Sequence, residues 1–293
     1  MDGKVNRTYC GIMGLVVGDA LGVPYEFKER DTYKITGMEG FGTHNQPPGT
    51  WSDDSSMTIA TMESIARLGK IDINDIMQNF EAWLFKGEFT PYGEVFDCGR
   101  TCRSAIKRFH EGREAKSCGC KGFNDNGNGS LMRILPLAFV PHTKIDVYYV
   151  SCLTHAHEIA IMGCQHYIQI CEKLLNGSNK LEAIQNLMDI EDYYGTIPNV
   201  ADVPRDKIRS SGYVVDTLEA AVWSFVTTDS YKECVITAAE LGNDTDTVAA
   251  IAGGLAGIYY GIGNEKGIPQ EWIDVIPRKE YIRELCEKDI FMI

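Results

Sequence analysis

Hydrophobic side chains recur every three or four residues along most of the chain, and the alternation that marks a β-strand hardly occurs. One such stripe runs from Met57 to Leu68, after a loop rich in glycine and proline. This spacing places the apolar side chains on one face of a helix, so we expect an all-α fold. Helices are predicted over 57–68, 74–86, 159–174, 215–225, 231–241 and 247–260.

Long polar connections separate the predicted helices, at 22–52, 87–99, 111–130 and 191–212. Loops of this length in a compact protein are usually functional or disordered, and these are rich in Asp, Asn, Gly and Tyr rather than low-complexity repeats. We find no internal repeat and no segment with the composition of a linker. We therefore expect one compact domain that spans residues 1–293.

The composition is that of an ordinary globular protein, with 44% hydrophobic and 24% charged residues among 293. The formal net charge of −13 argues against general nucleic-acid binding, because a protein that grips a phosphate backbone normally has a basic face. A small phosphorylated ligand could still be held locally by backbone N–H groups or metal ions. The oligomeric state stays open, with a monomer slightly favoured.

The start of the chain lacks the features of a signal peptide, and no apolar run approaches the roughly 20 residues that cross a bilayer. We therefore expect a cytoplasmic protein that does not enter a membrane.

The ten cysteines of the chain are expected to be reduced thiols. The spacings among Cys98, Cys102, Cys118 and Cys120 match no common structural zinc pattern, which disfavours zinc.

Two clusters of acidic and hydroxyl side chains lie far apart in the sequence, each at the start of a predicted helix. They are "TWSDDSSMT" at 50–58 and "GNDTDTVAAIAGG" at 242–254. Oxygen ligands of this kind suit hard cations such as Mg²⁺, Mn²⁺ or Ca²⁺. Either cluster alone is also explained as a helix N-cap. Capping needs one acceptor rather than four carboxylates, and these would raise one another's pKa without cations, so the pair favours more than one metal ion.

Other metal motifs do not fit these clusters. An EF-hand loop needs a further oxygen ligand after Asp246, where Val248 stands. The chain has no His-Asp dipeptide of the kind found in helical phosphohydrolases, and "DDSSM" breaks the DDxxD box of isoprenoid synthases.

Three further segments contain polar side chains suited to a binding site. "GDALGVPYEF" at 18–27 places Asp19 and Glu26 around a predicted glycine turn after a helix, and "LTHAHEIAIMG" at 153–163 includes His155. "NDNGNGSLMRILPLA" at 124–138 is expected to run into an apolar helix, where glycine-rich backbone can present N–H groups to an anion. Taken alone, that segment is also explained as a plain turn.

These five segments, in this order, resemble the ADP-ribosylglycohydrolase family, which includes dinitrogenase-reductase-activating glycohydrolases and animal ADP-ribosylhydrolases. The resemblance extends from "GDALGVPYE" at residue 18 to "GNDTDTVAAIAGGLAG" ending at residue 257. It implies a compact all-α domain with a binuclear Mg²⁺ or Mn²⁺ centre in a cleft. The positions that match the family's metal ligands are Ser52, Asp53, Asp54, Asp244, Asp246 and Thr247.

The resemblance also implies where ADP-ribose would bind. The segment from Asp125 to Ser130 matches the loop that cradles ADP-ribose in the family, His155 matches a ligand-contacting histidine, and Tyr213 matches a tyrosine near the pocket. The residues expected to contact the substrate are Asn126, Gly127, Asn128, Gly129, Ser130, His155 and Tyr213.

The implied chemistry is hydrolysis of a glycosidic bond at the ribose, whose oxocarbenium-like transition state is stabilised by nearby carboxylates. Two divalent cations would orient the ribose hydroxyls and a water. We expect a carboxylate among Glu26, Asp54 and Asp125 to accept the proton. Asp125 stands where arginine-specific bacterial members resemble this chain, whereas the animal branch that acts on serine linkages tends to have serine. That favours ADP-ribosyl-arginine as the substrate.

Other functions remain open at this point. The partner is expected to be an ADP-ribosylated protein or a small ADP-ribosyl conjugate. One alternative is a non-catalytic ADP-ribose-binding protein, and another is a dinuclear-metal hydrolase of a different ADP-ribosyl or phosphorylated small molecule. The complete set of acidic residues favours an enzyme, because a binding protein without activity would not need them all.

Overall fold

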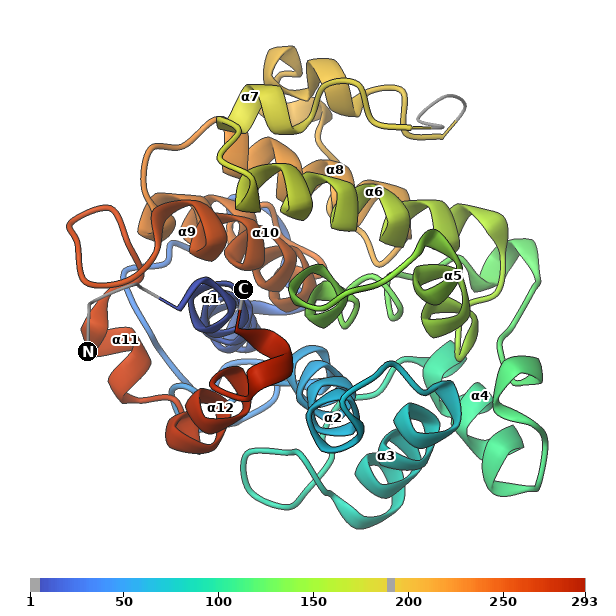
Figure 1. The fold of residues 1–293 in the computed structure, drawn as a ribbon. Helices are drawn as coiled ribbons and strands as arrows, with labels where there is room; N and C mark the ends of the chain where they lie inside the picture. The colour runs from blue at the N-terminus through green and yellow to red at the C-terminus, as the bar shows by residue number, and fades with distance from the viewer. Residues whose placement is uncertain (1–5, 189–192, 293) are drawn as a thin grey trace.

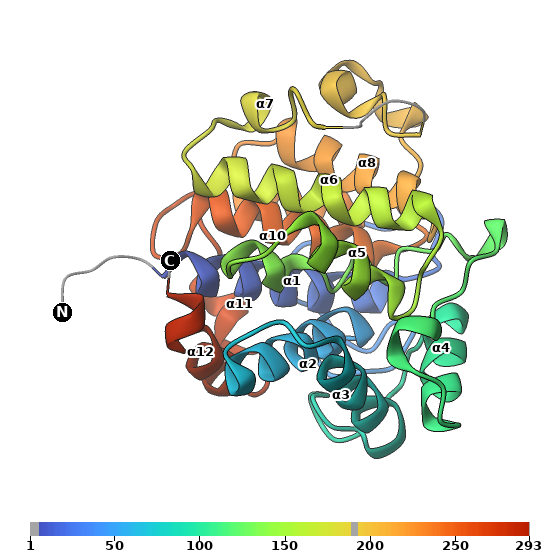
Figure 2. The ribbon, with the colours of Figure 1, turned by 45° about the vertical axis from the view of Figure 1, so that its right-hand side comes forward.

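Two helices rich in small residues, α1 (Arg7–Gly22) and α10 (Thr245–Tyr260), lie side by side in the middle of the protein (Figure 1). In this computed structural model, which describes residues 6–188 and 193–292, α6, α8 and α9 pack against α10. On the other side, α2 and α12 pack against α1, and α3 packs on α2 (Figure 2). One continuous hydrophobic core joins these layers.

The all-α prediction is confirmed, because extended pairing within the described residues is limited to isolated bridges. The helices found where periodicity predicted them agree closely in their bounds. The helices other than α1 and α10 are α2 (Asp53–Leu68), α3 (Ile73–Lys86), α4 (Arg100–His110), α5 (Lys144–Cys152), α6 (Glu158–Leu175), α7 (Lys180–Ala183), α8 (Val214–Val226), α9 (Tyr231–Ala239), α11 (Gln270–Asp274) and α12 (Lys279–Cys286).

Glycine allows α1 and α10 to approach within backbone contact. Gly14, Gly18 and Gly22 follow one another at intervals of four on α1, which places them on one face. A Cβ at Gly14 would lie 2.3 Å from the carbonyl oxygen of Gly253, and one at Gly18 would lie 2.1 Å from that of Ala249. No side chain fits between the two helices at these points. The pairing also shows that the helices run antiparallel.

The predicted glycine turn around Asp19 is wrong, because α1 continues through Gly18 and Gly22. These glycines are packing positions rather than turn positions. Asp19 therefore lies inside the helix, fully buried, and its carboxylate accepts hydrogen bonds from the N–H groups of Ser52 (2.9 Å) and Ser55 (3.0 Å). Asp19 thus caps the N-terminus of α2 from a neighbouring helix.

The predicted apolar α-helix after the Gly/Asn segment is also wrong. Residues 128–133 form turns, and the only helical element that follows directly in this described stretch is the 3₁₀ helix Leu135–Phe139, with Pro136 near its start. Proline disfavours the α conformation of the residue before it, which explains why no α-helix develops here. The loop's amide groups therefore have no helix dipole behind them.

The other sequence predictions have mixed outcomes. All ten cysteines are free thiols, as predicted. The long connections at 87–99 and 111–130 are present, although the second contains short 3₁₀ turns. The predicted loop at 191–212 begins at two residues that lie outside the described residues. Within the described parts of the chain, none of the helices combines the length and apolarity needed to span a bilayer.

We predict that Gly14→Ala destabilises the protein, because the added methyl would meet the backbone of α10. We expect the free energy of unfolding to fall by about 1–3 kcal/mol. Gly195→Ala is the matched control, since no atom lies within 4 Å of the added Cβ. It should change the value by less than about 0.5 kcal/mol. Urea unfolding of both variants measures this; equal stability would show that α1 and α10 do not depend on their close contact.

Candidate active site

A cleft of about 280 Å³ opens where the N-termini of α2 and α10 meet. Its walls also include residues from the loop after α1, from the start of α4 and from the loop rich in Gly and Asn at 124–130, called the Gly/Asn loop below. The structure therefore brings together most of the segments that the sequence marked as chemically interesting. The predicted site residues that line the cleft are Glu26, Asp53, Gly127, Asn128, Gly129, His155, Asp244 and Thr247.

The first acidic cluster begins α2. Ser52 is the N-cap, and its Oγ lies 2.9 Å from Oδ2 of Asp54, to which it donates. Asp53 and Asp54 occupy the first turn and are buried, with exposed fractions of 7% and 1%. Capping therefore accounts for the serine but not for the two aspartates, which are too buried for solvent to offset their charge.

The second acidic cluster begins α10. Asp244 stands at the N-cap but makes no capping hydrogen bond; its Oδ2 accepts one from the side chain of Asn128 (2.8 Å). The Thr247 hydroxyl donates to Oδ2 of Asp54 at 3.4 Å, which joins the two clusters across 193 residues of sequence. The N-cap explanation of this cluster therefore does not fit, and the two clusters form one site.

Carboxylate oxygens converge in two overlapping groups of the described residues. One oxygen from each of Asp19, Asp54 and Asp246 lies within 4.8 Å of the others, and the same holds for Glu26, Asp244 and Asp246. Burial, followed by the neighbouring carboxylates, raises the pKa of Asp54 and Asp246 well above their ordinary range. These acidic clusters could hold metal ions, because a bound cation would offset the charge.

One atom in particular fits a bound cation. Oδ1 of Asp54 is buried and has no hydrogen-bond partner within the part of the chain that the structure describes. Buried carboxylate oxygens are almost always paired, so an unpaired one in a carboxylate cluster is what an oxygen-coordinated ion would satisfy. Asp19 differs, since both its oxygens already accept hydrogen bonds from Ser52 and Ser55.

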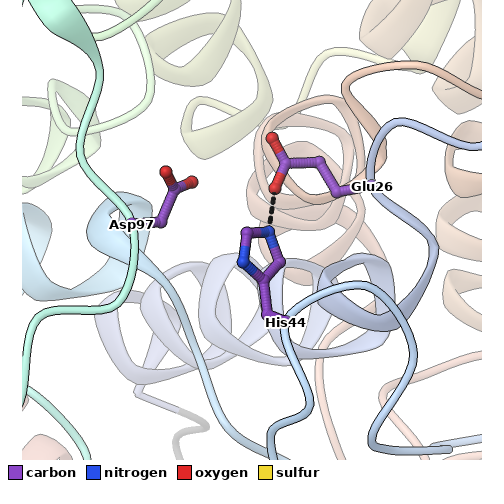
Figure 3. Close-up of side chains that lie close together, drawn as sticks. All are labelled: Glu26, His44 and Asp97. Carbon is purple, nitrogen blue, oxygen red and sulfur yellow. Dashed lines mark hydrogen bonds and ion pairs between the residues drawn. The ribbon is translucent and has the colours of Figure 1, made fainter.

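Sequence analysis missed two residues beside Glu26, which are shown in Figure 3. His44 forms a hydrogen bond through Nε2 with the Glu26 carboxylate, and Asp97 approaches both from the loop before α4. Burial raises the pKa of Glu26 to about 7, although the His44 hydrogen bond opposes the shift. That hydrogen bond in turn raises the pKa of His44. Both new residues lie in long polar loops that the sequence marked as functional, but no local motif singled them out.

The Gly/Asn loop also lines the cleft, and it contacts the second acidic cluster through the hydrogen bond from Asn128 to Asp244. It is fixed by a short antiparallel pairing: the Asn128 N–H donates to the Gly212 carbonyl (3.1 Å), and the Val214 N–H donates to that of Asn126 (3.0 Å). A Cβ at Gly129 would lie 2.9 Å from Cε1 of His155, so glycine is required for the loop to lie against this ring.

Seven predicted site residues do not line the cleft. Ser52, Asp54 and Asp246 are buried within the two acidic clusters. The other four lie in the Gly/Asn loop or next to it. Asp125 accepts from the Gly122 N–H (3.2 Å) and pairs with the exposed Arg100 (3.4 Å). Asn126, Ser130 and Tyr213 support the loop or its surroundings: the Asn126 amide donates to the Phe123 carbonyl, Ser130 bonds Ser151, and Tyr213 pairs opposite Gly127. Their direct roles with a substrate therefore stay predictions.

Comparison with known proteins identifies the family. The description "ADP-ribosylglycohydrolase" belongs to the family profile that matches residues 2–292. The chain belongs to the ADP-ribosylglycohydrolase family. The resemblance noted from five sequence segments is thereby confirmed, and it extends over nearly the whole chain.

Relatives match this family member over nearly its whole length, and one solved structure has a similar fold. The chain is 34% identical to ADP-ribosylarginine hydrolase Tri1 of Serratia proteamaculans, over 99% of this chain and 80% of that protein. It is 31% identical to the ADP-ribosyl-[dinitrogen reductase] glycohydrolase of Rhodospirillum rubrum, over 94% and 91%. A solved structure described as an ADP-ribosylglycohydrolase-related protein complex matches with a TM-score of 0.80 and 29% identity, covering 96% and 95%.

We predict that the stability of this family member without metal falls as pH rises. Buried carboxyls with raised pKa hold protons that unfolded carboxyls lose from about pH 4, so the folded state binds more protons between the two pKa values. Glu26, with a pKa near 7, extends this window to neutral pH. With EDTA, we expect the free energy of unfolding to drop by at least about 1 kcal/mol between pH 5 and 7.5.

Urea unfolding at several pH values, with EDTA or with added Mg²⁺ or Mn²⁺, measures this dependence. Added metal should restore stability at neutral pH, because binding to the folded state alone stabilises it. Asp54→Asn should flatten the pH dependence and weaken the metal effect, whereas the exposed Asp206→Asn should leave both unchanged. A metal-free protein that is equally stable across this range would contradict the interpretation of the cluster.

Proposed function

We propose that this protein is a metal-dependent hydrolase that removes ADP-ribose from a modified arginine side chain of a protein. The observation that carries the proposal is the meeting of two acidic clusters, 193 residues apart, beside a glycine-lined wall in one cleft. The names of two relatives, an ADP-ribosylarginine hydrolase and an ADP-ribosyl-[dinitrogen reductase] glycohydrolase, support the reaction, and the first also supports arginine as the modified side chain.

The cofactors proposed are two divalent cations, Mg²⁺ or Mn²⁺. The donor set consists of carboxylate and hydroxyl oxygens, which these hard cations prefer. When bound, the cations would supply Lewis-acid chemistry toward ligand and water oxygens. The residues proposed to hold them are Ser52, Asp53, Asp54, Asp244, Asp246 and Thr247.

Other residues of the chain position the metal ligands, shape the cleft and accept the proton. Asn128 holds Asp244 in place, since its amide donates to both Asp244 and Thr217. The glycines at 127 and 129 allow the loop backbone, which lines the cleft, to lie against the His155 ring. Glu26 is the best placed of the three proposed proton acceptors. It lines the cleft, whereas Asp54 lies beneath its floor and Asp125 is paired at the surface.

We predict that the purified protein releases free ADP-ribose from an arginine-ADP-ribosylated protein in the presence of Mg²⁺ or Mn²⁺. EDTA should prevent release, and Asp53→Ala/Asp54→Ala should lower the rate by at least about 10²-fold, because several kcal/mol of transition-state stabilisation depend on the charged site. Chromatographic detection of released ADP-ribose measures this, with the exposed Asp206→Asn as the matched control.

Serine-linked ADP-ribose and calorimetry with ADP-ribose distinguish the alternatives. Release of ADP-ribose from modified serine but not from modified arginine would show that the enzyme hydrolyses the serine linkage instead. Binding of ADP-ribose without any release would favour a non-catalytic binder. If metal binds but ADP-ribose does not, a different dinuclear-metal hydrolase becomes the better interpretation.

A separate variant tests the proton acceptor. Glu26→Gln keeps the shape of the side chain but cannot accept the proton, so we expect kcat to fall by about 10²–10⁴-fold. ADP-ribose affinity should change far less, which calorimetry checks. If Glu26→Gln hydrolyses at the wild-type rate while Asp125→Asn does not, the acceptor is Asp125 instead.

A further inference from the structure

His155, which lines the cleft, is linked to the buried Arg133 by a series of hydrogen bonds on the side of the ring away from the cleft. Arg133 is fully buried, and its Nη2 donates to the Thr154 hydroxyl (2.8 Å) and to the Val150 carbonyl (3.1 Å). The same hydroxyl lies 2.9 Å from Nδ1 of His155. The three side chains are therefore linked in series from the core to the cleft.

The chemistry of the three groups indicates which atom donates and which accepts in each hydrogen bond of this series. A guanidinium has only donors, so the Thr154 oxygen must accept from Arg133. The single hydroxyl hydrogen is then free to donate, and an Nδ1 of His155 without a proton is the strongest acceptor within its reach. The sulfur of Cys102 also lies near this hydroxyl, but a thiol is a much weaker acceptor than an imidazole nitrogen.

The direction of the hydrogen bonds decides the form of the imidazole. When Nδ1 accepts the Thr154 hydrogen, the ring proton of a neutral imidazole resides on Nε2. Burial, reinforced by the positive charge of Arg133, lowers the pKa of His155 to about 3, so the ring stays neutral in the physiological range. His155 is therefore a neutral group with one donor, and that donor lies on the edge away from Arg133.

The Nε2 edge of the ring lies at the cleft wall. A Cβ at either Gly127 or Gly129 would come within 3.5 Å of Nε2, so this edge faces the loop that lines the cleft. The hydrogen bond that fixes the ring is made at Nδ1. Nε2–H is thus positioned to donate to a ligand oxygen.

We propose that Arg133 and Thr154 are positioning residues that lock His155 as the Nε2–H tautomer, so that it donates a hydrogen bond to an acceptor oxygen of the ADP-ribosyl ligand. The identity of that ligand rests on the proposed function, whereas the tautomer does not. The opposite tautomer would turn a lone pair toward the ligand, and this lone pair repels an oxygen that has no hydrogen, such as a phosphate oxygen. The hydroxyl of Thr154, which is fully buried and does not line the cleft, therefore decides whether His155 can donate a hydrogen bond to such an oxygen.

The first measurement is a long-range ¹H–¹⁵N spectrum of the histidine rings in the full-length protein at neutral pH with Mg²⁺. The His155 signals are assigned by their loss in His155→Gln. We expect an unprotonated Nδ1 and a protonated Nε2. A protonated Nδ1 in the wild-type protein would overturn the proposal, and this result needs no ligand and no activity.

The second measurement compares ADP-ribose affinity by calorimetry in matched variants. Thr154→Val keeps the shape but removes the hydroxyl, so we expect a mixture of tautomers and a Kd about 10- to 100-fold weaker. Thr154→Ser, which keeps the hydroxyl, should retain both the Nε2–H tautomer and the wild-type affinity for ADP-ribose. His155→Gln, whose amide can donate from near the Nε2 position, should bind more tightly than His155→Asn.

The outcomes separate this inference from the proposed function. Thr154→Val with an unchanged Nε2–H tautomer and unchanged Kd would overturn the positioning role. If Thr154→Val does not fold, Thr154→Ala, which also lacks the hydroxyl, and the wild-type spectrum still decide the positioning role. If the wild-type protein shows the Nε2–H tautomer but neither binds nor releases ADP-ribose, the tautomer lock stands and the proposed function fails.

Discussion

The close contact between α1 and α10 is the constraint on which the site depends. Because glycine backbones meet where side chains would otherwise separate the helices, the end of α1 lies directly against the start of α10, where a Cβ at Gly22 would come 2.4 Å from Cα of Asp246. Asp19 on α1 then caps α2, which sets the position of Asp53 and Asp54 relative to Asp246. One packing interaction thus places carboxylates from three helices within a few ångströms of each other.

That geometry concentrates negative charge in a place from which water is largely excluded. The described carboxylates at the junction are buried, and desolvation together with mutual repulsion disfavours their ionised forms. The acids differ in function, however. Asp19 has its oxygens paired with α2 and serves the fold, whereas Asp54 retains an unpaired oxygen and Asp244 faces the cleft. The site is therefore a set of carboxylates held together by the fold against their own repulsion, which a cation would relieve.

The part of the cleft lined by the Gly/Asn loop and His155 presents hydrogen-bond donors rather than carboxylates. There the Gly/Asn loop approaches His155, and behind this ring lies the buried guanidinium of Arg133, stacked 4.6 Å from the centre of the Phe80 ring. Arg133 supplies positive potential and, through Thr154, hydrogen-bond direction without reaching the cleft itself. Acidic groups and hydrogen-bond donors in one cleft suit a ligand that carries both hydroxyl and phosphate oxygens, such as ADP-ribose.

The sequence by itself determined the helical class, the bounds of most long helices and the two acidic motifs, because apolar periodicity and motif chemistry are local properties of the chain. It also carried enough ordered motifs to indicate the family. Only the tertiary structure decided that Asp19 is a cap, that His44 and Asp97 join Glu26, and that Asp125 pairs with Arg100 instead of facing the cleft. These outcomes depend on how closely two glycine-rich helices approach and on the paths of long loops. Neither is encoded in the spacing of neighbouring residues.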